Sequence, residues 1–318
     1  MEQVIYQFDP ASIVTQSTPV GSVNGHGTAI IVSTRGRPDI VASLVTQLGE
    51  QTMPPEHIYI IATKADDIAR LDPNQQNLTV TIGRPGSTFQ RNDGLKLAGS
   101  RFSTIVFFDD DFVPSRFWLE RMQAIFDARP DVAGLTGNVL ADGTRGPGIK
   151  LDDAKLMVDF RDREAATDGA FHETFAYGSN VGCNMAYRYS AIRDIVFDES
   201  MPAYAWHEDS DFRGQVERRG LFVRAENLWG VHLGHKQGRS SGLALGYSQI
   251  ANAVYLARKG TVPAGFLAEI ATKNVIVNAL RSFNPEPFCD RRGRLKGNMI
   301  ALTDLVRGRL APARILEL

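Results

Sequence analysis

Cysteine is scarce in this chain of 318 residues, which contains only Cys183 and Cys289. Two cysteines are too few for a disulfide scaffold or for a zinc site built from thiolates. Long hydrophobic runs are also missing, because none approaches the ~18 residues that a membrane-spanning helix requires. The first residues lack the apolar core of a signal peptide. We therefore expect a cytoplasmic protein in a reducing compartment.

An excess of charge of one sign is absent as well. The 35 basic residues nearly balance the 36 acidic residues, which argues against a general nucleic-acid binder. The charges are unevenly distributed, however. From Arg281 to residue 318 there are eight basic and four acidic residues, so this basic end carries +4 and the rest of the chain −5. The near-neutral total therefore combines an acidic body with a basic end.

Short apolar runs alternate with helical patterns in the first half of the chain. Continuous apolar strands separated by helices are typical of a parallel sheet that is covered on both faces. We therefore expect an α/β fold with a mostly parallel sheet, which binds its ligands at the carboxyl ends of the strands. The predicted strands are Thr28–Ser33, His57–Ala62, Leu78–Ile82, 103–108 and 132–136.

The second half of the chain has a less regular pattern. Residues 141–166 are polar and rich in glycine, which predicts a long loop, whereas 207–219 predicts a helix and 221–224 and 228–232 predict short strands. A Gly/Ser-rich break at 238–242 precedes a stretch with helical patterns almost throughout. We divide the chain into an N-terminal extension (1–27), a sheet domain (28–242) and a C-terminal helical appendage (243–318).

Three carboxylates follow the fourth predicted strand directly, at Asp109, Asp110 and Asp111. Adjacent like charges repel one another, so this cluster does not stabilise the fold by itself. A divalent cation with oxygen ligands removes the repulsion, and Mg²⁺ or Mn²⁺ held in this way commonly bridges substrate phosphates. A solvated acidic turn before the next helix is the alternative. The position at a strand end favours the metal site.

Five segments of the chain occur in a characteristic order: IIVSTRGRP, FQRNDGLKLAGS, VFFDDDFVP, FWLERMQAIF and WHEDSDFRGQVERRG. Together they resemble the GT-A nucleotide-sugar transferases, specifically the family-2 glycosyltransferases. The resemblance covers roughly residues 28–242, about two thirds of the chain. A D-x-D motif alone is a weak signal, but the ordered set is specific. The resemblance implies a GT-A fold and a sugar transfer from a nucleoside-diphosphate donor, with Mn²⁺ or Mg²⁺ as the cofactor.

The resemblance also assigns residues to the donor. In the family pattern Asp109 contacts the ribose and the metal, and Asp111 binds the metal, with Asp110 between them at the nucleotide sugar. Thr34 and Arg35, in the loop after the first strand, match positions that contact the nucleotide. The implied donor site is completed by Arg91 at the start of a later helix.

One departure from the family concerns the base of the donor. Relatives commonly carry an acid after the second strand, whereas this chain has Ala62, Thr63 and Lys64 at the matching places. We place Lys64 at the nucleotide sugar and regard Asp66 or Asp67 as the substitutes for the missing acid. Uridine, thymidine and guanosine all stay open as the base.

The Glu-Asp segment after Trp206 supplies the candidate base of the reaction. Asp209 is expected near a helix N-terminus, where the helix dipole keeps a carboxylate ionised. In inverting relatives the Asp of this motif removes the proton from the acceptor hydroxyl, and a helix N-cap is the alternative role. Trp206, His207 and Glu208 are then expected on the acceptor side.

The segment VHLGHKQGRSSG offers a further metal ligand. Some relatives supply a histidine from this region, and both His232 and His235 qualify. We prefer His235, because it lies at the start of the predicted loop. Lys236 and Arg239 are then expected near the diphosphate. An ordinary surface loop is the alternative.

The combined interpretation is a metal-dependent, inverting glycosyltransferase that acts on a glycan or lipid-linked acceptor in the synthesis of bacterial polysaccharides or cell-envelope glycans. A nucleotidyltransferase, or a non-catalytic protein that binds nucleotide sugars or glycans on the same fold, is the alternative. The basic end predicts peripheral contact with the inner face of an anionic membrane. A packed helical cap or a dimer interface would explain that end equally well.

Overall fold

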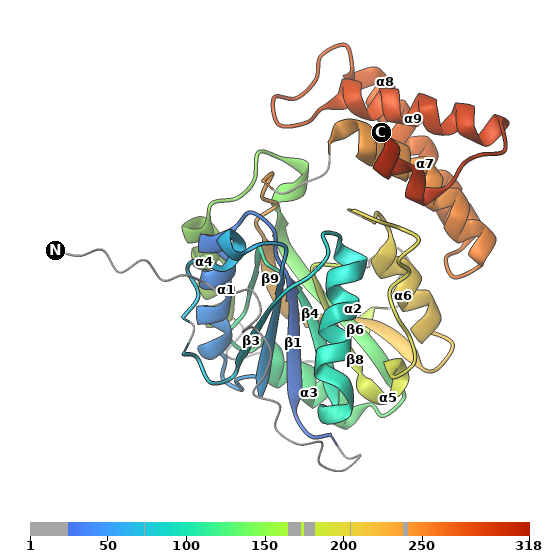
Figure 1. Cartoon of the computed structure of the whole chain (residues 1–318). Helices are drawn as coiled ribbons and strands as arrows, with labels where there is room; N and C mark the ends of the chain where they lie inside the picture. The colour runs from blue at the N-terminus through green and yellow to red at the C-terminus, as the bar shows by residue number, and fades with distance from the viewer. Residues whose placement is uncertain (1–24, 73, 165–172, 175–181, 204, 238–240) are drawn as a thin grey trace.

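The computed structural model describes residues 25–72, 74–164, 173–174, 182–203, 205–237 and 241–318. In these residues nine strands form one sheet in the order β3-β2-β1-β4-β8-β6-β9-β5, with β7 paired to β9 (Figure 1). The strands are β1 (Thr28–Ser33), β2 (His57–Ala62), β3 (Leu78–Ile82), β4 (Thr104–Asp109), β5 (Phe112–Pro114), β6 (Val132–Asp142), β7 (Glu173–Thr174), β8 (Asn184–Arg188) and β9 (Leu221–His232).

Helices cover the sheet and form a separate group near the end of the chain (Figure 1). The helices around the sheet are α1 (Pro38–Gly49), α2 (Ser87–Ala98), α3 (Trp118–Ala128), α4 (Leu151–Glu164), α5 (Tyr189–Ile192) and α6 (Glu208–Val216). The C-terminal helices are α7 (Gly242–Lys259), α8 (Ala264–Arg281) and α9 (Arg291–Val306). None of the described helices is both long and apolar enough to span a bilayer.

Four of the five strands predicted in the first half, β1 to β4, pair in parallel with one another, whereas the fifth, at the start of β6, pairs with β8 and β9. β1 lies between β2 and β4, and β3 extends the sheet beyond β2. The second half departs from this pattern, since β8 is antiparallel to both β4 and β6 and β5 is antiparallel to β9. The residues between 221 and 232 form one strand, β9, rather than two short ones. This long strand brings residues near 232 back to the carboxyl end of β4.

Alternate side chains of β1 enter two different cores. Ile30 and Val32 pack with α1 and α3 on one face, whereas Ala29 and Ile31 pack with α2, α5 and α6 on the other. A strand that is buried on both faces must be apolar at every position, which explains the continuous run in the sequence. Burial on both faces holds the strand ends in fixed positions.

The loop predicted at 141–166 is wrong, because helix α4 occupies its second half. The helix buries only a narrow stripe, formed by Ala154 and Val158, against Val113, Val231 and Leu233. Its other large apolar side chains, Leu156, Met157 and Phe160, are exposed, and most of the remaining positions are charged. A stripe this narrow gives a weak helical pattern, which is why the sequence suggested a loop.

The C-terminal helices are firmly attached to the sheet domain. Met201 and Ala205, which precede α6, are buried in one apolar cluster with Ala253 and Leu256 of α7. The same junction carries a buried ion pair, since Lys259 Nζ lies 2.8 Å from Oδ2 of Asp211. Asp211 is completely buried, so it is not a charge on the surface of α6.

Candidate active site

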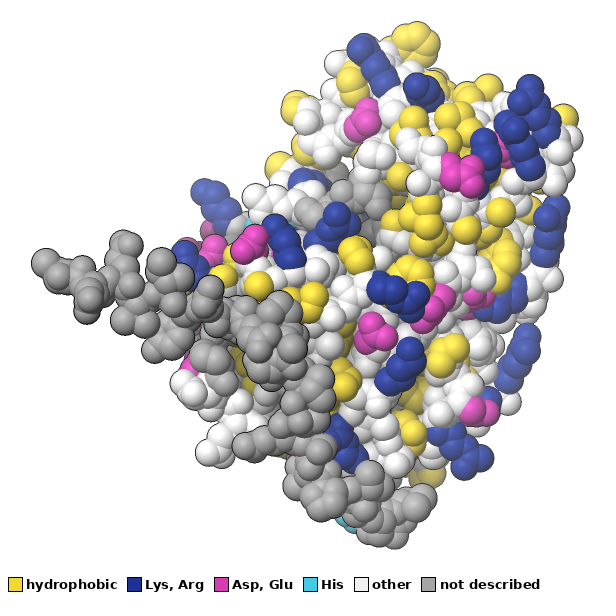
Figure 2. All heavy atoms as spheres, viewed as in Figure 1, with side chains coloured by type: hydrophobic (Ala, Val, Ile, Leu, Met, Phe, Trp, Pro, Cys, Tyr) yellow, Lys and Arg dark blue, Asp and Glu magenta, His cyan; other side chains and the backbone are white. Residues whose placement is uncertain are grey.

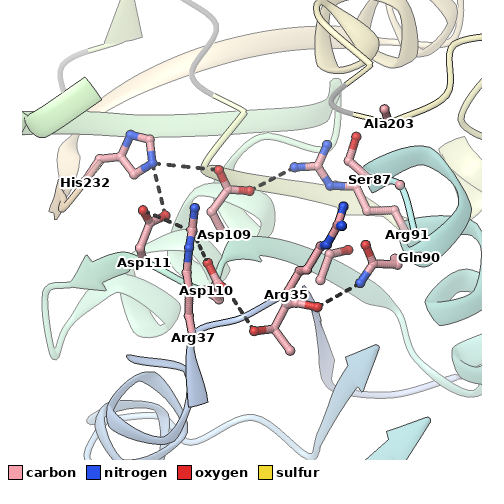
Figure 3. A pocket seen from close by; sticks show the side chains of 13 residues that line it. Arg35, Arg37, Ser87, Gln90, Arg91, Asp109, Asp110, Asp111, Ala203 and His232 are labelled. Atoms are coloured by element: carbon pink, nitrogen blue, oxygen red, sulfur yellow. Dashed lines mark hydrogen bonds and ion pairs between the residues drawn. The ribbon is translucent and has the colours of Figure 1, made fainter. Parts of the chain in front are cut away.

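The carboxyl ends of β1 and β4 lie side by side and open onto a cavity of about 150 Å³, the inner cavity (Figure 3). Parallel pairing places Ser33 at the end of β1 opposite Asp109 at the end of β4. Thr34 connects the two ends, because its Oγ1 donates a hydrogen bond to Oδ2 of Asp110 at 2.8 Å. The inner cavity brings together Thr34, Arg35, Arg91, Asp109, Asp110 and Asp111, all of which the sequence placed at the nucleotide sugar or the metal.

Two of these carboxylates and a histidine converge on one point. His232 Nε2 lies 3.2 Å from Oδ1 of Asp111 and 3.9 Å from Oδ2 of Asp109. One potential ligand atom from each of the three residues lies within 4.8 Å of the other two. Carboxylate oxygens and an imidazole nitrogen form a donor set that suits Mn²⁺ and, through the oxygens, Mg²⁺. The three residues therefore fit a divalent cation.

His232 is also oriented from its other side. Its Nδ1 lies 3.1 Å from Oδ1 of Asp142, at the end of β6. Burial alone would lower the pKa of His232, but the hydrogen bonds to Asp111 and Asp142 outweigh it and raise the pKa to about 10. The imidazole thus lies between the carboxylates of Asp111 and Asp142. A carboxylate behind a metal-binding histidine is a common arrangement, which fixes the ring and raises its basicity.

The structure favours His232 over His235 as the histidine at this point. Antiparallel pairing of β5 with β9 sets His232 opposite Phe112, next to Asp111. His235 contributes its backbone instead, with its N–H donating to Oδ2 of Asp111 at 2.8 Å. The preference for His235 rested on its place at the start of the predicted loop, whereas His232 reaches Asp111 from the last position of β9. The sequence left both histidines open and ranked them in the other order.

Arg37 is a site residue that the sequence analysis missed. Its Nη1 lies 2.6 Å from Oδ1 of Asp110 and 3.2 Å from Oδ2 of Asp111. Its Nη2 donates to the carbonyl oxygens of His235 at 3.1 Å and Gln237 at 2.9 Å. One guanidinium thus ties the loop after β1 to the aspartates and to the segment after β9. The only signal in the sequence was a second arginine in STRGRP.

Arg91 links the aspartates to the Glu-Asp motif. From the first turns of α2 its buried guanidinium reaches Oδ1 of Asp109 at 3.0 Å and Oε1 of Glu208 at 2.7 Å. Burial raises the pKa of Glu208 to about 8, although the charge of Arg91 opposes that shift. Two motifs that lie far apart in the sequence are therefore joined through one side chain.

Asp209 lies in a second cavity of about 350 Å³, the middle cavity, which adjoins the inner one. It is the second residue of α6, and its Oδ1 accepts a hydrogen bond from the N–H of Ser210 at 2.8 Å. Its other oxygen faces Gly182, where an added Cβ would lie only 2.9 Å away. The middle cavity brings Asp209 together with Trp206, His207, Glu208, Arg91, Asp109 and His232.

The backbone before α6 is unusual. Ala203, Ala205 and His207 adopt φ angles of 61°, 49° and 71°, in the left-handed region that side chains disfavour. Each such residue costs of order 1–3 kcal/mol, and this strain persists only where the surroundings enforce it. The buried contacts of Ala205 with α7 supply that enforcement. Strained residues cluster at functional sites, and here they set the start of the helix that carries Asp209.

Other predicted residues lie elsewhere. Lys64 is largely exposed, pairs with Asp66 at 3.2 Å and lines neither cavity. Lys236 Nζ donates to the carbonyl oxygens of Gly143 and Thr144. Arg239 lies outside the described residues. Asp67 is buried and accepts from the N–H groups of Gly36, Thr63 and Lys64, so it anchors the loop after β1.

Comparison with known proteins gives a clear result for the fold alone. No family model matches the chain, and no curated protein matches it. Among solved structures, S. aureus TarS 1-349 in complex with UDP-GlcNAc is 17% identical with a TM-score of 0.52, over 91% of this chain and 82% of that one. The chain has the GT-A fold. The predicted α/β architecture is thereby confirmed.

A second solved structure supports the same fold. Glucosyl-3-phosphoglycerate synthase from Mycobacterium tuberculosis, in complex with Mn²⁺, UDP and phosphoglyceric acid, is 14% identical with a TM-score of 0.50. The match covers 78% of this chain and 86% of that one. The chain spans 44% of the longer TarS chain. Both matched proteins bind nucleotides, and the GT-A fold is what this chain shares with them.

Proposed function

We propose that this protein is a metal-dependent glycosyltransferase that transfers a sugar from a nucleoside-diphosphate donor to an acceptor hydroxyl. The observation that carries the proposal is the Arg91 bridge, in which one guanidinium binds Asp109 and Glu208. Arg91 and Asp209 line one cavity together with the candidate metal ligands Asp109 and His232. Donor, metal and base are the three components that such a transfer requires.

The donor's nucleoside diphosphate would occupy the inner cavity. Thr34, Arg35 and Asp109 would contact the nucleotide, while Asp109, Asp111 and His232 would hold the metal. A bound Mn²⁺ or Mg²⁺ would supply Lewis-acid stabilisation of the leaving diphosphate. The UDP-GlcNAc bound to the matched TarS structure and the UDP and Mn²⁺ bound to the matched synthase support a uridine donor and Mn²⁺ as the first choices to test.

Asp209 would remove the proton from the acceptor hydroxyl as that oxygen attacks the anomeric carbon from the face opposite the diphosphate. Direct displacement of this kind inverts the anomeric configuration. Asp209 lies in the first turn of α6, and the neighbouring Glu208 is held by Arg91. A base in this position contributes about 10²–10⁴-fold to the rate.

A thermal-shift experiment tests the donor site directly. The full chain is heated with UDP, dTDP, GDP and UDP-GlcNAc, each with and without Mn²⁺ or Mg²⁺. We expect stabilisation by at least one nucleotide that depends on the metal, and loss of that effect in Asp111→Asn. No stabilisation by any combination would overturn the proposal. Release of pyrophosphate rather than a nucleoside diphosphate during turnover would identify a nucleotidyltransferase instead.

We further propose that the acceptor is a glycan or a lipid-linked glycan of a bacterial envelope, reached at an anionic membrane surface. The outer face of α8 and α9 exposes large apolar side chains beside basic ones (upper part of Figure 2). Phe283 and Val306 are 86% and 89% exposed. The face comprises Ile276, Leu280, Phe283, Met299 and Val306 with Arg292 and Lys296.

Co-flotation with vesicles that contain anionic lipid tests this membrane contact. We expect the wild-type chain to float and Phe283→Glu/Val306→Glu to float less, because apolar insertion and cationic attraction act together. Substitution is preferable to truncation, since α9 packs closely against α7. Equal flotation of both proteins would remove this face from the proposal.

A further inference from the structure

A third cavity adjoins the middle cavity on the side away from β1 and the inner cavity. This outer crevice has a volume of about 660 Å³ and lies between the sheet domain and helices α7, α8 and α9. The middle cavity shares lining residues with both neighbours, whereas the inner cavity and the outer crevice share none among the described residues. The inner and middle cavities share Ser87, Arg91, Asp109 and His232. The middle cavity and the outer crevice share Thr144, Trp206 and Ile270.

The order of the three cavities gives the donor and the acceptor separate places. The proposed donor occupies the inner cavity and Asp209 lies in the middle one. Among the described residues the outer crevice adjoins the middle cavity on its other side, so we assign the approach of the acceptor to the crevice. Trp206 lines both the middle cavity and the crevice, so an acceptor sugar that reaches Asp209 passes its indole.

The walls of the outer crevice are strongly basic. Among its described lining residues, four are cations and only Asp290 is a carboxylate. Arg291 forms an ion pair with Glu286 at 2.9 Å, which offsets part of this charge. Asp290 accepts a hydrogen bond from the N–H of Gly293 and caps α9. The four cations are Arg145, Lys236, Arg291 and Arg294.

Arg145 is the most available of these cations. It follows β6, is exposed, and forms no ion pair with a carboxylate among the described residues. Lys236 is held differently, since its Nζ is fixed over the carbonyl oxygens of Gly143 and Thr144. Backbone carbonyls position an ammonium group without neutralising it. The crevice thus presents one cation held by backbone carbonyl oxygens, Lys236, and one exposed cation, Arg145.

We propose that the outer crevice binds an anionic group of the acceptor, a phosphate or a carboxylate close to the hydroxyl that receives the sugar. Arginine and lysine bind both groups through charge-assisted hydrogen bonds. The apolar cluster around Ala205 and Leu256 holds the two walls together, so the crevice is formed before the acceptor binds. This inference rests on the proposed function, because Asp209 defines where the reacting hydroxyl lies.

Binding of three matched sugars tests the inference. The full chain is first saturated with Mn²⁺ and with the nucleoside diphosphate that stabilises it, so that anions cannot enter the inner cavity. Glucose, glucuronate and glucose 6-phosphate are then titrated by calorimetry. We expect at least one anion to bind about tenfold more tightly than glucose, as one charge-assisted hydrogen bond allows. The preference should shrink at high salt.

Variants locate the binding in the crevice. Arg145→Gln and Arg294→Gln should each remove most of the preference for the anion. Arg292→Gln is the matched control. Arg292 lies two residues from Arg294 on α9, but it lines a different groove, next to Phe283, and does not line the outer crevice. Arg292→Gln should keep the full preference.

The outcomes separate the two proposals. Preference for glucuronate identifies a carboxylate acceptor, and preference for glucose 6-phosphate identifies a phosphate acceptor. Equal binding of all three sugars, or equal loss in Arg292→Gln, would overturn the crevice assignment while nucleotide binding stayed intact. A failure of every nucleotide to bind with Mn²⁺ would instead overturn the glycosyltransferase proposal itself.

Discussion

Cations in the inner cavity and cations on the C-terminal helices serve different purposes. Arg37 and Arg91 are largely buried, and each contacts two carboxylates. Arg292 and Lys296 are exposed on α9 and pair with no carboxylate among the described residues. The buried cations therefore organise the protein's own acids, whereas the exposed ones are available for anions from outside. Composition alone does not distinguish these roles.

Replacing the proposed base should have the largest effect on turnover. Asp209→Asn should lower kcat by about 10²–10⁴-fold, because the acceptor hydroxyl loses its proton acceptor. Metal-dependent nucleotide binding, measured by thermal shift, should be unchanged. Asp211→Asn is the contrasting variant, since it removes the buried partner of Lys259 and should lower stability. Undiminished turnover by Asp209→Asn would exclude Asp209 as the base.

Breaking the buried bridge should cost more stability than removing an exposed cation. Arg91→Gln leaves Asp109 and Glu208 without their shared partner, and loss of one member of a buried pair costs about 3–5 kcal/mol. Arg292→Gln at the surface should change the free energy of unfolding by less than about 0.5 kcal/mol. Urea denaturation of both variants measures the difference. Equal effects would contradict the distinction between the two kinds of cation.

The two histidines provide a sharper test within the site. His232→Asn should weaken Mn²⁺ binding by about 10–100-fold or more, because it removes a proposed ligand. His235→Asn should leave the affinity nearly unchanged, since residue 235 contacts Asp111 through its backbone N–H. Isothermal titration with Mn²⁺ compares the variants. A larger loss in His235→Asn would restore the original preference.

The smallest predicted effect concerns the junction with α7 and depends on pH. Burial alone would raise the pKa of Asp198, but its bonds to Lys259 and Tyr255 outweigh it and lower the pKa to about 2. The ionised form is therefore favoured in the folded protein. Its stabilisation is present above pH 4 and is lost as the pH falls from about 4 to 2. We expect a contribution of about 1–2 kcal/mol, because partial exposure weakens the pair.

Urea denaturation at several pH values measures this contribution. Asp198→Asn should be less stable than wild type above pH 4, and the difference should shrink towards pH 2. Asp152→Asn, on the exposed face of α4, serves as the control and should follow the wild-type curve. A constant difference between Asp198→Asn and wild type at all pH values would contradict the assignment.

Local patterns in the sequence predicted the parallel half of the sheet and its strand-end carboxylates. They did so because each buried strand is apolar along its whole length and Asp109 follows one directly. They did not place His232 beside Asp111, since this contact arises through the pairing of β5 with β9. Arg37 and Asp142 were missed for the same reason. Contacts between distant segments leave no periodic signal.

Two glycines at the crossing of α7 and α9 limit which changes of sequence this protein can tolerate. A Cβ on Gly246 would clash with the backbone of Arg294, and one on Gly297 would clash with the carbonyl oxygen of Leu243. The helices are thus fitted to each other, and α7 is fitted to the sheet domain through Leu256. Replacing α7, α8 and α9 together by the helices of a homologous chain would disrupt both sets of contacts. A new acceptor preference should therefore evolve by single substitutions on the crevice wall, and directed evolution should begin with residues such as Arg145.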